Sequence, residues 1–391
     1  MTTAGRGFVS GPVFLGAVVA SIGGPLALLA LYLPGAAGDG FAALGLTVAL
    51  ALLVFLAPLA IWLGFSERIA SAGGLAAFVE ASAGRRLARI QALIWIVSYF
   101  LYLPYTITYI VYDLLPPLFP GIVAYRGWLE VLLPIGIVAL ALAPLSASLG
   151  ALGVVAAAQL VVMAILGGLL YGHTGASISS FRPHVAGPPL WRGVGAVALL
   201  FICISLPLFF AAEVRGSNRT VRRGMASGYG IVAVFLLFAA VPLASVAQYV
   251  TGTDLPGVVI AQADSGRAFA EVVLLVGAAS VAGLIVLELL ALGRLLHWLF
   301  GTAIRPTLAA IAVPFVLADV FSLLDPERFY DDLLRPSLIA LFASQLIVFL
   351  VYPLYRRGEP DRLPASIAFS VVASALVGYG LYTAITGSAG T

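Results

Sequence analysis

Long apolar segments recur along the chain and are separated by short polar links. Each is about 18 residues or longer, close to the length that an α-helix needs to cross a bilayer. The segments do not alternate apolar and polar residues, as the strands of an outer-membrane barrel do. The pattern therefore predicts an all-α integral membrane protein with about 11 transmembrane helices. The predicted spans are residues 8–33, 41–65, 90–115, 128–145, 149–171, 195–212, 225–250, 268–292, 307–324, 334–355 and 363–385.

The first span is interrupted near its middle, where Gly23 and Gly24 are followed by Pro25. Glycine and proline both weaken a helix, and proline has no N–H to donate. Backbone groups that a break leaves free at bilayer depth are tolerated only beside protein or a solvated cavity. Free amides at such a break can bind a carboxylate, and free carbonyls a cation. We therefore expect Ser21, Ile22, Gly23 and Gly24 to bind a substrate.

Ser205 and Pro207 interrupt the sixth span, five spans after the first interruption. Corresponding breaks in two five-span halves are typical of inverted-repeat secondary transporters, whose substrate site lies where the repeats meet. This predicts a first repeat at residues 1–172, a second at 173–355 and an additional C-terminal span at 356–391. Ile202, Cys203 and Ser205 then become candidate substrate-binding residues. The alternative interpretation is a simple proline kink, since prolines also occur in other spans.

Composition and charge indicate how the chain is oriented. Of its 391 residues, 62% are hydrophobic and 9% are charged, and all 20 basic residues are arginine. With the N-terminus inside, arginines concentrate in the inner links, as the positive-inside rule predicts. An odd number of spans places the C-terminus outside, which we expect in a cytoplasmic (inner) membrane. Because this topology accounts for the net charge of +3, no nucleic-acid partner is expected. The inner set is Arg6, Arg68, Arg85, Arg86, Arg89, Arg215, Arg219, Arg222, Arg223, Arg294, Arg305, Arg356, Arg357 and Arg362, and the outer set is Arg126, Arg182, Arg192, Arg267, Arg328 and Arg335.

Several short motifs occur in the order found in a known family. They are residues 33–35 (LPG), residues 66–84 (SERIASAGGLAAFVEASAG), residues 213–220 (EVRGSNRT) and Arg294 near the end of the eighth span. Together they resemble the amino acid–polyamine–organocation (APC) superfamily of permeases. The resemblance implies a LeuT-type 5+5 inverted repeat with one extra helix. It also implies transport of an amino acid or related organic ion by alternating access.

The resemblance also narrows the expected substrate. The family's unwound element of helix one falls on residues 21–25, and its helix-six element falls on residues 202–207. The second element lacks the family's glycine and acid, which implies a neutral amino acid with an apolar or aromatic side chain. An amine or other organic ion on the same scaffold is the alternative. A membrane enzyme or a transporter-like sensor is less favoured.

The third span carries a series of tyrosines, from Tyr99 to Tyr112. Most of them follow three- and four-residue spacings, which place them on one helical face. Facing a cavity, phenol rings offer an apolar wall with a hydrogen-bonding tip. Tyr99 and Tyr102 are therefore candidate substrate-binding residues. Helix packing and an interfacial aromatic belt are the alternatives.

Glu288 lies well inside the eighth span, where a buried acid is a candidate for carrying a coupling proton. An ion pair or gate with Arg294 is the alternative. In sodium-dependent relatives, hydroxyls of helix eight help to hold sodium, and Ser280 is the matching hydroxyl here. Sodium, a proton, and exchange without a coupling ion all stay open. Glu130 and Asp319 are expected to be helix-end or interface groups.

Cys203 is the only cysteine, and the three histidines lie far apart in the sequence. No spacing suggests a metal site, and no nucleophile and base occur together. We therefore expect no metal, no cofactor and no enzymatic activity. The expected partners are a small-molecule substrate and membrane lipid, and the sequence does not determine an oligomeric state. The sequence as a whole predicts a secondary active transporter.

Overall fold

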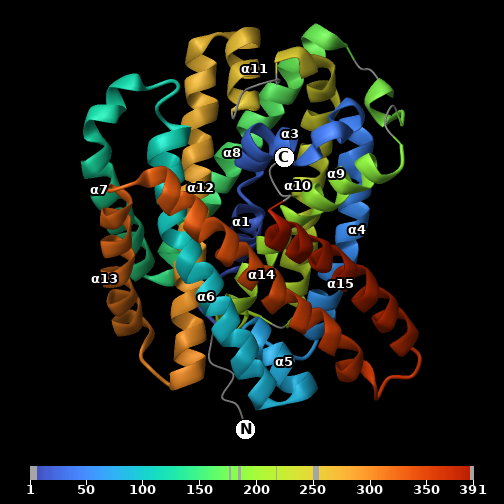
Figure 1. The fold of residues 1–391 in the computed structure, drawn as a ribbon. Helices are drawn as coiled ribbons and strands as arrows, with labels where there is room; N and C mark the ends of the chain where they lie inside the picture. Colours follow the sequence, from blue (N-terminus) through green and yellow to red (C-terminus); the bar gives the residue numbers. More distant parts are fainter. Residues whose placement is uncertain (1–6, 176–177, 184–185, 217, 250–254, 388–391) are drawn as a thin grey trace.

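The computed structural model describes residues 7–175, 178–183, 186–216, 218–249 and 255–387. Over these ranges, eleven helices are long and apolar enough to cross a membrane. The predicted all-α membrane fold is therefore confirmed (Figure 1). Arg6 and His184 lie outside the described residues.

Spans one to five form the first half of the chain. Span one contains α1 (Gly11–Ser21), α2 (Pro25–Ala27), η1 (Leu28–Tyr32) and α3 (Leu33–Ala37), and span two contains η2 (Gly38–Ala43) and α4 (Leu44–Phe65). A link helix α5 (Leu75–Ala83) follows, and then span three with α6 (Arg85–Tyr109) and η3 (Ile110–Leu114). Span four contains η4 (Pro120–Tyr125) and α7 (Arg126–Leu142), and span five is α8 (Leu145–Thr174).

The remaining elements form spans six to eleven. After η5 (Ile178–Phe181), span six contains α9 (Pro188–Leu199) and η6 (Ile202–Glu213), and span seven contains α10 (Asn218–Leu243) and η7 (Ala244–Tyr249). A short helix α11 (Pro256–Ser265) precedes span eight, which is α12 (Arg267–Phe300). Spans nine, ten and eleven are α13 (Ile304–Ser322), α14 (Pro326–Arg356) and α15 (Leu363–Thr386).

Span one is broken where the sequence predicts it. Gly23 and Gly24 have φ angles of +58° and +63°, in the region that favours glycine. Pro25 opens α2, where its missing N–H costs no helical hydrogen bond. The two glycines therefore end α1, and the proline starts the second half of the span.

Span six breaks earlier than predicted. The α-helix α9 ends at Leu199, ahead of Ser205 and Pro207, and a turn at Leu200 and Phe201 follows it. From Ile202 the chain continues as a 12-residue 3₁₀ helix, η6. Most 3₁₀ helices are only about 3–4 residues long. The interruption is thus a change of helix type that begins at residue 200.

The broken spans lie in the core, together with α6 and α12. Within the described ranges, η6 is buried along most of its length, and so is α12 from Val281 to Leu295. Figure 1 shows α7 and α13 together on one flank of the bundle and α15 on the opposite flank. Side chains such as Val313 and Phe321 of α13 stay exposed on the outside, as expected beside lipid.

The bundle has two chemically different ends. Span one ends, α9 begins and α15 ends at one of them. At the other, η6 and α14 end and α1 begins. This second end carries Arg68, Arg222, Arg294, Arg356 and Arg362, and we call it the Arg-rich end.

Candidate functional site

A cavity of about 1050 Å³ reaches into the bundle from the end opposite the Arg-rich end. At its inner part it touches both broken spans, at Gly23 in span one and at Leu200 and Ile202 in span six. Its walls are mainly apolar side chains and tyrosines. The lining includes Gly23, Leu28, Tyr32, Tyr102, Tyr105, Tyr109, Arg192, Leu199, Leu200, Ile202, Cys203, Val281, Leu284, Tyr330, Leu334, Leu338, Leu341, Phe342, Tyr379 and Thr383.

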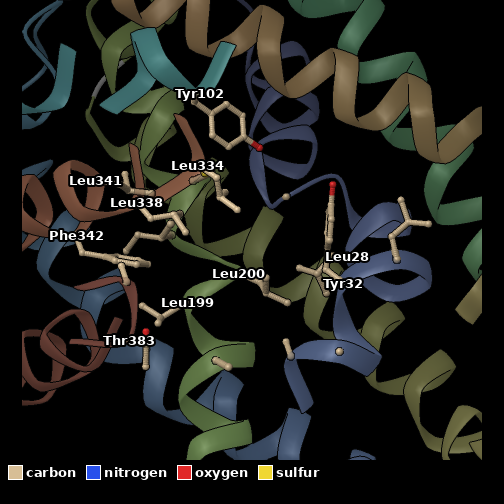
Figure 2. Close-up of a pocket in the computed structure, with 18 of the residues that line it drawn as sticks. Leu28, Tyr32, Tyr102, Leu199, Leu200, Leu334, Leu338, Leu341, Phe342 and Thr383 are labelled. Carbon is tan, nitrogen blue, oxygen red and sulfur yellow. The ribbon is translucent and has the colours of Figure 1, made fainter. Parts of the chain in front are cut away.

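Two walls of different chemistry face each other across the cavity (Figure 2). Leu338, Leu341 and Phe342 of α14 form an apolar wall, and Tyr32 with Leu28 of span one lies opposite. A cavity with these walls suits a solute that carries a large apolar group.

The tyrosine face of the third span lies partly on the cavity. Tyr102, Tyr105 and Tyr109 line it, together with Tyr32 and Tyr330, which the sequence analysis did not select. Ring contacts join these side chains, for example between Tyr105 and Tyr330 (5.4 Å between centroids) and between Tyr32 and Tyr109 (6.1 Å). Tyr330 lies in the second turn of α14, far from α6 in sequence, so no local spacing could have identified it.

Cys203 forms part of the cavity floor, and Tyr99 lies directly behind it. The Tyr99 hydroxyl and the Cys203 sulfur are 3.8 Å apart and form a hydrogen bond in which either atom can donate. Tyr99 is 1% exposed and packs against Trp95, with ring centroids 4.0 Å apart. Tyr99 therefore supports the floor from below, whereas Cys203 is part of its surface.

Four predicted site residues reach the cavity: Gly23, Tyr102, Ile202 and Cys203. The others are buried behind its wall. They are Ser21, Ile22, Gly24, Tyr99, Ser205, Ser280 and Glu288.

The backbone at the break in span one is less open than expected. The Ile22 N–H donates to the Val19 carbonyl (3.3 Å), and the Gly23 N–H donates to the Ser21 carbonyl (2.9 Å). The Ser21 hydroxyl donates to the Val18 carbonyl (2.7 Å). The expectation of free amides around Ile22–Gly24 is therefore wrong for Ile22 and Gly23, whose N–H groups the tight turn satisfies internally.

Gln159 of α8 is a site residue that the sequence analysis missed. Its Oε1 accepts the backbone N–H of Leu26 (3.2 Å) and the hydroxyl of Ser280 (2.7 Å). One amide oxygen therefore joins span five to the second half of span one and to span eight. The Gln159 Nε2 is buried and has no partner among the described residues.

The absence of a side chain at Gly24 leaves space for the Ser280 hydroxyl and the Gln159 side chain. A Cβ at Gly24 would overlap the Ser280 hydroxyl and come within 3.4 Å of the Gln159 Oε1. Ser280, the predicted sodium ligand, thus donates to a neutral amide. A glutamine in an apolar span gives no pattern that predicts partners more than 100 residues away in sequence.

Ser205 of η6 is a packing residue in this structure. Its hydroxyl donates to the Ile202 carbonyl (3.2 Å) and accepts the side-chain N–H of Gln345 of α14 (3.2 Å). These bonds hold the start of η6 against span ten.

Glu288 lies below the cavity floor and is 0% exposed. Val281 and Leu284 line the cavity, and Glu288 follows on the same face of α12, one turn deeper. Both carboxyl oxygens lack a hydrogen-bond partner among the described residues. The group is within electrostatic range of Tyr99, Tyr102, Tyr105 and Cys203.

Arg294 pairs with Glu213 at the end of η6, and the alternative of an ion pair with Glu288 is therefore wrong. The two guanidinium–carboxylate distances are 3.1 and 2.9 Å, a bidentate geometry. The guanidinium also lies over the Phe210 ring, 4.8 Å from its centroid. This pair ties span eight to span six at the Arg-rich end.

Further contacts close the Arg-rich end. Val9 pairs with the strand-like end of span six: its N–H donates to the Glu213 carbonyl (3.0 Å), and its carbonyl accepts the Arg215 N–H (2.8 Å). Between this end and the cavity floor, the Trp95 and Phe209 rings pack against each other in a tilted arrangement with centroids 4.7 Å apart. Because both rings are buried, the cavity does not continue to the Arg-rich end.

Glu67, in the link after span two, is the centre of an arginine cluster. Its carboxylate lies 2.7 Å from Arg356, 3.0 Å from Arg362 and 3.2 Å from Arg222. Partial burial alone would raise the pKa of Glu67. The hydrogen bond from Arg356 and the charges of the three arginines outweigh that effect and lower the pKa below its ordinary value.

No group of three or more His, Cys, Asp or Glu side chains gathers into a metal-binding cluster within the described ranges. The candidate site is the cavity, with the broken first span at its base.

No protein-family model matches the chain, and no curated protein matches it in sequence. Solved structures match its fold over nearly the whole length. A substrate-bound, outward-open Na⁺-coupled sialic acid symporter is 14% identical with a TM-score of 0.62, and the match covers 98% of this chain and 91% of that chain. The chain has a LeuT-type fold.

Two other structures with the LeuT-type fold match similarly. A manganese transporter from Eremococcus coleocola is 12% identical with a TM-score of 0.58, and the match covers 95% of this chain and 88% of that chain. MhsT in complex with L-phenylalanine is 14% identical with a TM-score of 0.56, over 96% and 98% of the two chains. At such identities the likeness concerns the fold, and function has to be argued from the site.

Proposed function

We propose that this chain is a secondary active transporter, of the APC superfamily type, that moves a neutral amino acid across the cytoplasmic membrane by alternating access. One observation carries the proposal. The cavity reaches the broken spans from one end only, at Gly23 and Leu200, while the other end is closed by packed rings and ion pairs. A central site at broken helices with one closed side is the arrangement that alternating access requires. The proposal assigns the chain no enzymatic activity.

The cavity walls favour a substrate with an apolar or aromatic side chain. Such a side chain would lie between Leu28 and the apolar wall of α14, where burial of its surface contributes to binding. The polar backbone of the substrate would lie near Gly23, where the missing side chain allows close approach. MhsT, which has the same fold, binds L-phenylalanine in its solved structure.

The proposed topology follows from the arginine distribution. The Arg-rich end faces the cytoplasm, so the N-terminus is inside and the C-terminus outside. The two proposed repeats are residues 1–172 and 173–355, with residues 356–391 as an additional span. Opening of the Arg-rich end would require the Arg294–Glu213 pair to separate.

For coupling, we propose a proton carried by Glu288. Its two carboxyl oxygens are buried and unpartnered in the described part of the chain, directly below the cavity floor. Sodium is the alternative, since one protein with this fold is a Na⁺-coupled symporter. The Ser280 hydroxyl donates its proton to Gln159, and its oxygen lone pairs are the groups that would coordinate sodium in that alternative.

An organic amine is the second candidate substrate. Seven tyrosines of the described ranges line the cavity, and aromatic faces attract ammonium groups. Glu288 could then compensate the positive charge of the bound amine. This would explain an unpaired acid next to a tyrosine-lined cavity.

A binding and uptake experiment tests the proposal. The melting temperature of the purified protein is measured with neutral amino acids and with amines, with sodium or potassium, at pH 5.5 and pH 7.5. Hits are then tested as radiolabelled solutes in proteoliposomes. We expect stabilisation and uptake with an apolar or aromatic amino acid, driven by an inward proton gradient.

Other outcomes are equally informative. Stabilisation by amines alone would replace the amino acid by the second candidate, and uptake driven by sodium would replace the proton. The proposal of a transporter fails if solutes that stabilise the protein are not taken up under any gradient.

A further inference from the structure

Two acidic side chains are buried together on the lipid-facing flank, away from the cavity. Glu130 lies in the second turn of α7, and Asp319 lies in the last turn of α13. The two helices pack side by side (Figure 1). Both residues are 0% exposed, and Asp319 is within electrostatic range of Glu130. The expectation that both are simple helix-end or interface groups is therefore incomplete.

None of the four carboxyl oxygens has a hydrogen-bond partner among the described residues. Ser322, whose hydroxyl lies beside Glu130, donates to the Asp319 backbone carbonyl at 2.7 Å. The carboxyl groups themselves are thus unsatisfied in a place without access to solvent, which makes them candidates for binding a ligand.

The arginine closest to Glu130 along α7 contacts Tyr112, and its buried Nε has no hydrogen-bond partner among the described residues. Arg126, one turn before Glu130, lies 4.4 Å above the Tyr112 ring and donates to the Tyr112 carbonyl at 3.3 Å. Tyr112 of η3 also lies within electrostatic range of Glu130. The neighbouring α6 and α12 bring no ionisable side chain within that range of Asp319 in the described part of the chain. No arginine therefore neutralises the two acids.

Two adjacent carboxylates in such a place would be very unstable. Burying one unpaired ion costs several kcal/mol, and two like charges add repulsion. Either a cation or a proton has to compensate. Calcium takes about six to eight oxygen ligands, often including water, whereas this buried pair offers four carboxyl oxygens and no third acid, histidine or cysteine within the described ranges.

We propose that Glu130 and Asp319 form a buried proton-binding pair in which at least one carboxyl group stays protonated. The ligand is a proton, bound by carboxyl oxygens at the α7–α13 interface. Binding satisfies the buried oxygens and removes one negative charge. Release leaves two carboxylates next to each other and weakens the contact between the helices.

The position of this site gives the proton a structural role. The α7 helix is the fourth span and α13 the ninth, which correspond to each other in a 5+5 division of the chain. The proton would therefore join the two halves outside the substrate pathway. This inference does not depend on the proposed function, since it concerns groups that do not touch the cavity.

Infrared spectroscopy tests the site directly. Spectra of the purified full chain in lipid nanodiscs are recorded at neutral pH in H₂O and in D₂O. We expect a C=O stretching band of a protonated carboxyl that shifts in D₂O and is lost in the double variant E130Q/D319N. The amide side chains keep the shape and hydrogen bonding of a protonated pair, so this variant should fold. The variant E288Q identifies any band that belongs to Glu288.

Thermal stability at different pH values provides a second measurement. The wild-type melting temperature should fall as the pH rises from 6 to 10, because the site loses its proton. The melting temperature of the double variant should fall less over the same pH range. D332N, which removes an exposed acid of α14, is the control and should behave as wild type. Identical infrared spectra of wild type and double variant would overturn the proposal. So would stabilisation by Mg²⁺, Ca²⁺ or Mn²⁺ that the double variant loses, because the site would then bind a metal.

Discussion

At the scale of single residues, Gly24 combines two constraints. Its φ of +63° is unfavourable for any residue with a Cβ, by about 1–2 kcal/mol. A Cβ there would also overlap the hydroxyl of Ser280. We therefore expect Gly24→Ala to lower the melting temperature clearly and to abolish substrate binding, measured by thermal shift and by uptake.

Gly168 of α8 provides the matched control for this substitution. A Cβ at Gly168 meets nothing within 4 Å, and alanine favours a helix by about 1 kcal/mol over glycine. Gly168→Ala should therefore leave binding unchanged. Normal binding by Gly24→Ala would contradict the assignment of the break to the substrate site. Gly23 has a φ of +58° and carries the same backbone cost, and a Cβ there would lie 3.3 Å from the Leu200 carbonyl, so Gly23→Leu should lower both the melting temperature and binding.

Glu67 leads to a prediction about pH. Because its pKa is lowered in the folded protein, from an ordinary value of 4.5, the ionised form is the one that folding stabilises. The stabilising contribution is complete well above pH 4.5 and is lost as the pH falls through the lowered pKa. Glu67→Gln should therefore melt at a lower temperature than wild type at pH 7, and the difference should shrink towards pH 3.

Glu80→Gln is the control for Glu67→Gln, because Glu80 lies in the same link and the described structure shows no ion pair for it. It should melt as wild type does across this pH range. A difference between Glu67→Gln and wild type that does not change with pH would mean that the arginine cluster does not depend on the Glu67 charge.

At the scale of helices, Gln159 connects α8, α2 and α12 through one oxygen atom. Gln159→Ala leaves the buried Leu26 N–H and Ser280 hydroxyl without this acceptor, and each unsatisfied group costs about 1–3 kcal/mol. We expect a strong loss of thermal stability and of transport. Gln262→Ala on the exposed face of α11 should have little effect. If Gln159→Ala were as stable as wild type, water would have to replace the amide oxygen.

The two broken spans show which parts of the site a sequence can predict. The break in span one follows from Gly23, Gly24 and Pro25, whose backbone preferences are local. The break in span six begins at Leu200, where no glycine or proline is present, because packing of η6 in the core decides the helix type. Gln159 and Tyr330 were missed for a related reason. Their roles depend on partners in distant spans, and no periodicity within α8 or α14 indicates them.

At the scale of the whole molecule, Cys203 can report which end of the cavity is open. It is the only cysteine in the chain, and it lines the cavity floor with 9% of its surface exposed. A membrane-impermeant thiol reagent should therefore reach Cys203 through the cavity and not through the closed Arg-rich end. With the proposed topology, we expect slow labelling in right-side-out vesicles and much less in inside-out vesicles. A ligand that fills the cavity should slow this labelling, and Cys203→Ser should abolish it.

Arg294→Ala should then change the accessible side. It removes the bidentate pair with Glu213 and the contact with Phe210, so the closed end should open more often and labelling in inside-out vesicles should increase. Arg267→Ala is the matched control, because it breaks an exposed ion pair with Glu271 away from the Arg-rich end.

Equal labelling of the wild type from both sides would contradict the closed end. Labelling only in inside-out vesicles would contradict the proposed orientation. An increase with Arg294→Ala alone would show that the pair between spans six and eight holds the closed state, as alternating access between two discrete arrangements requires.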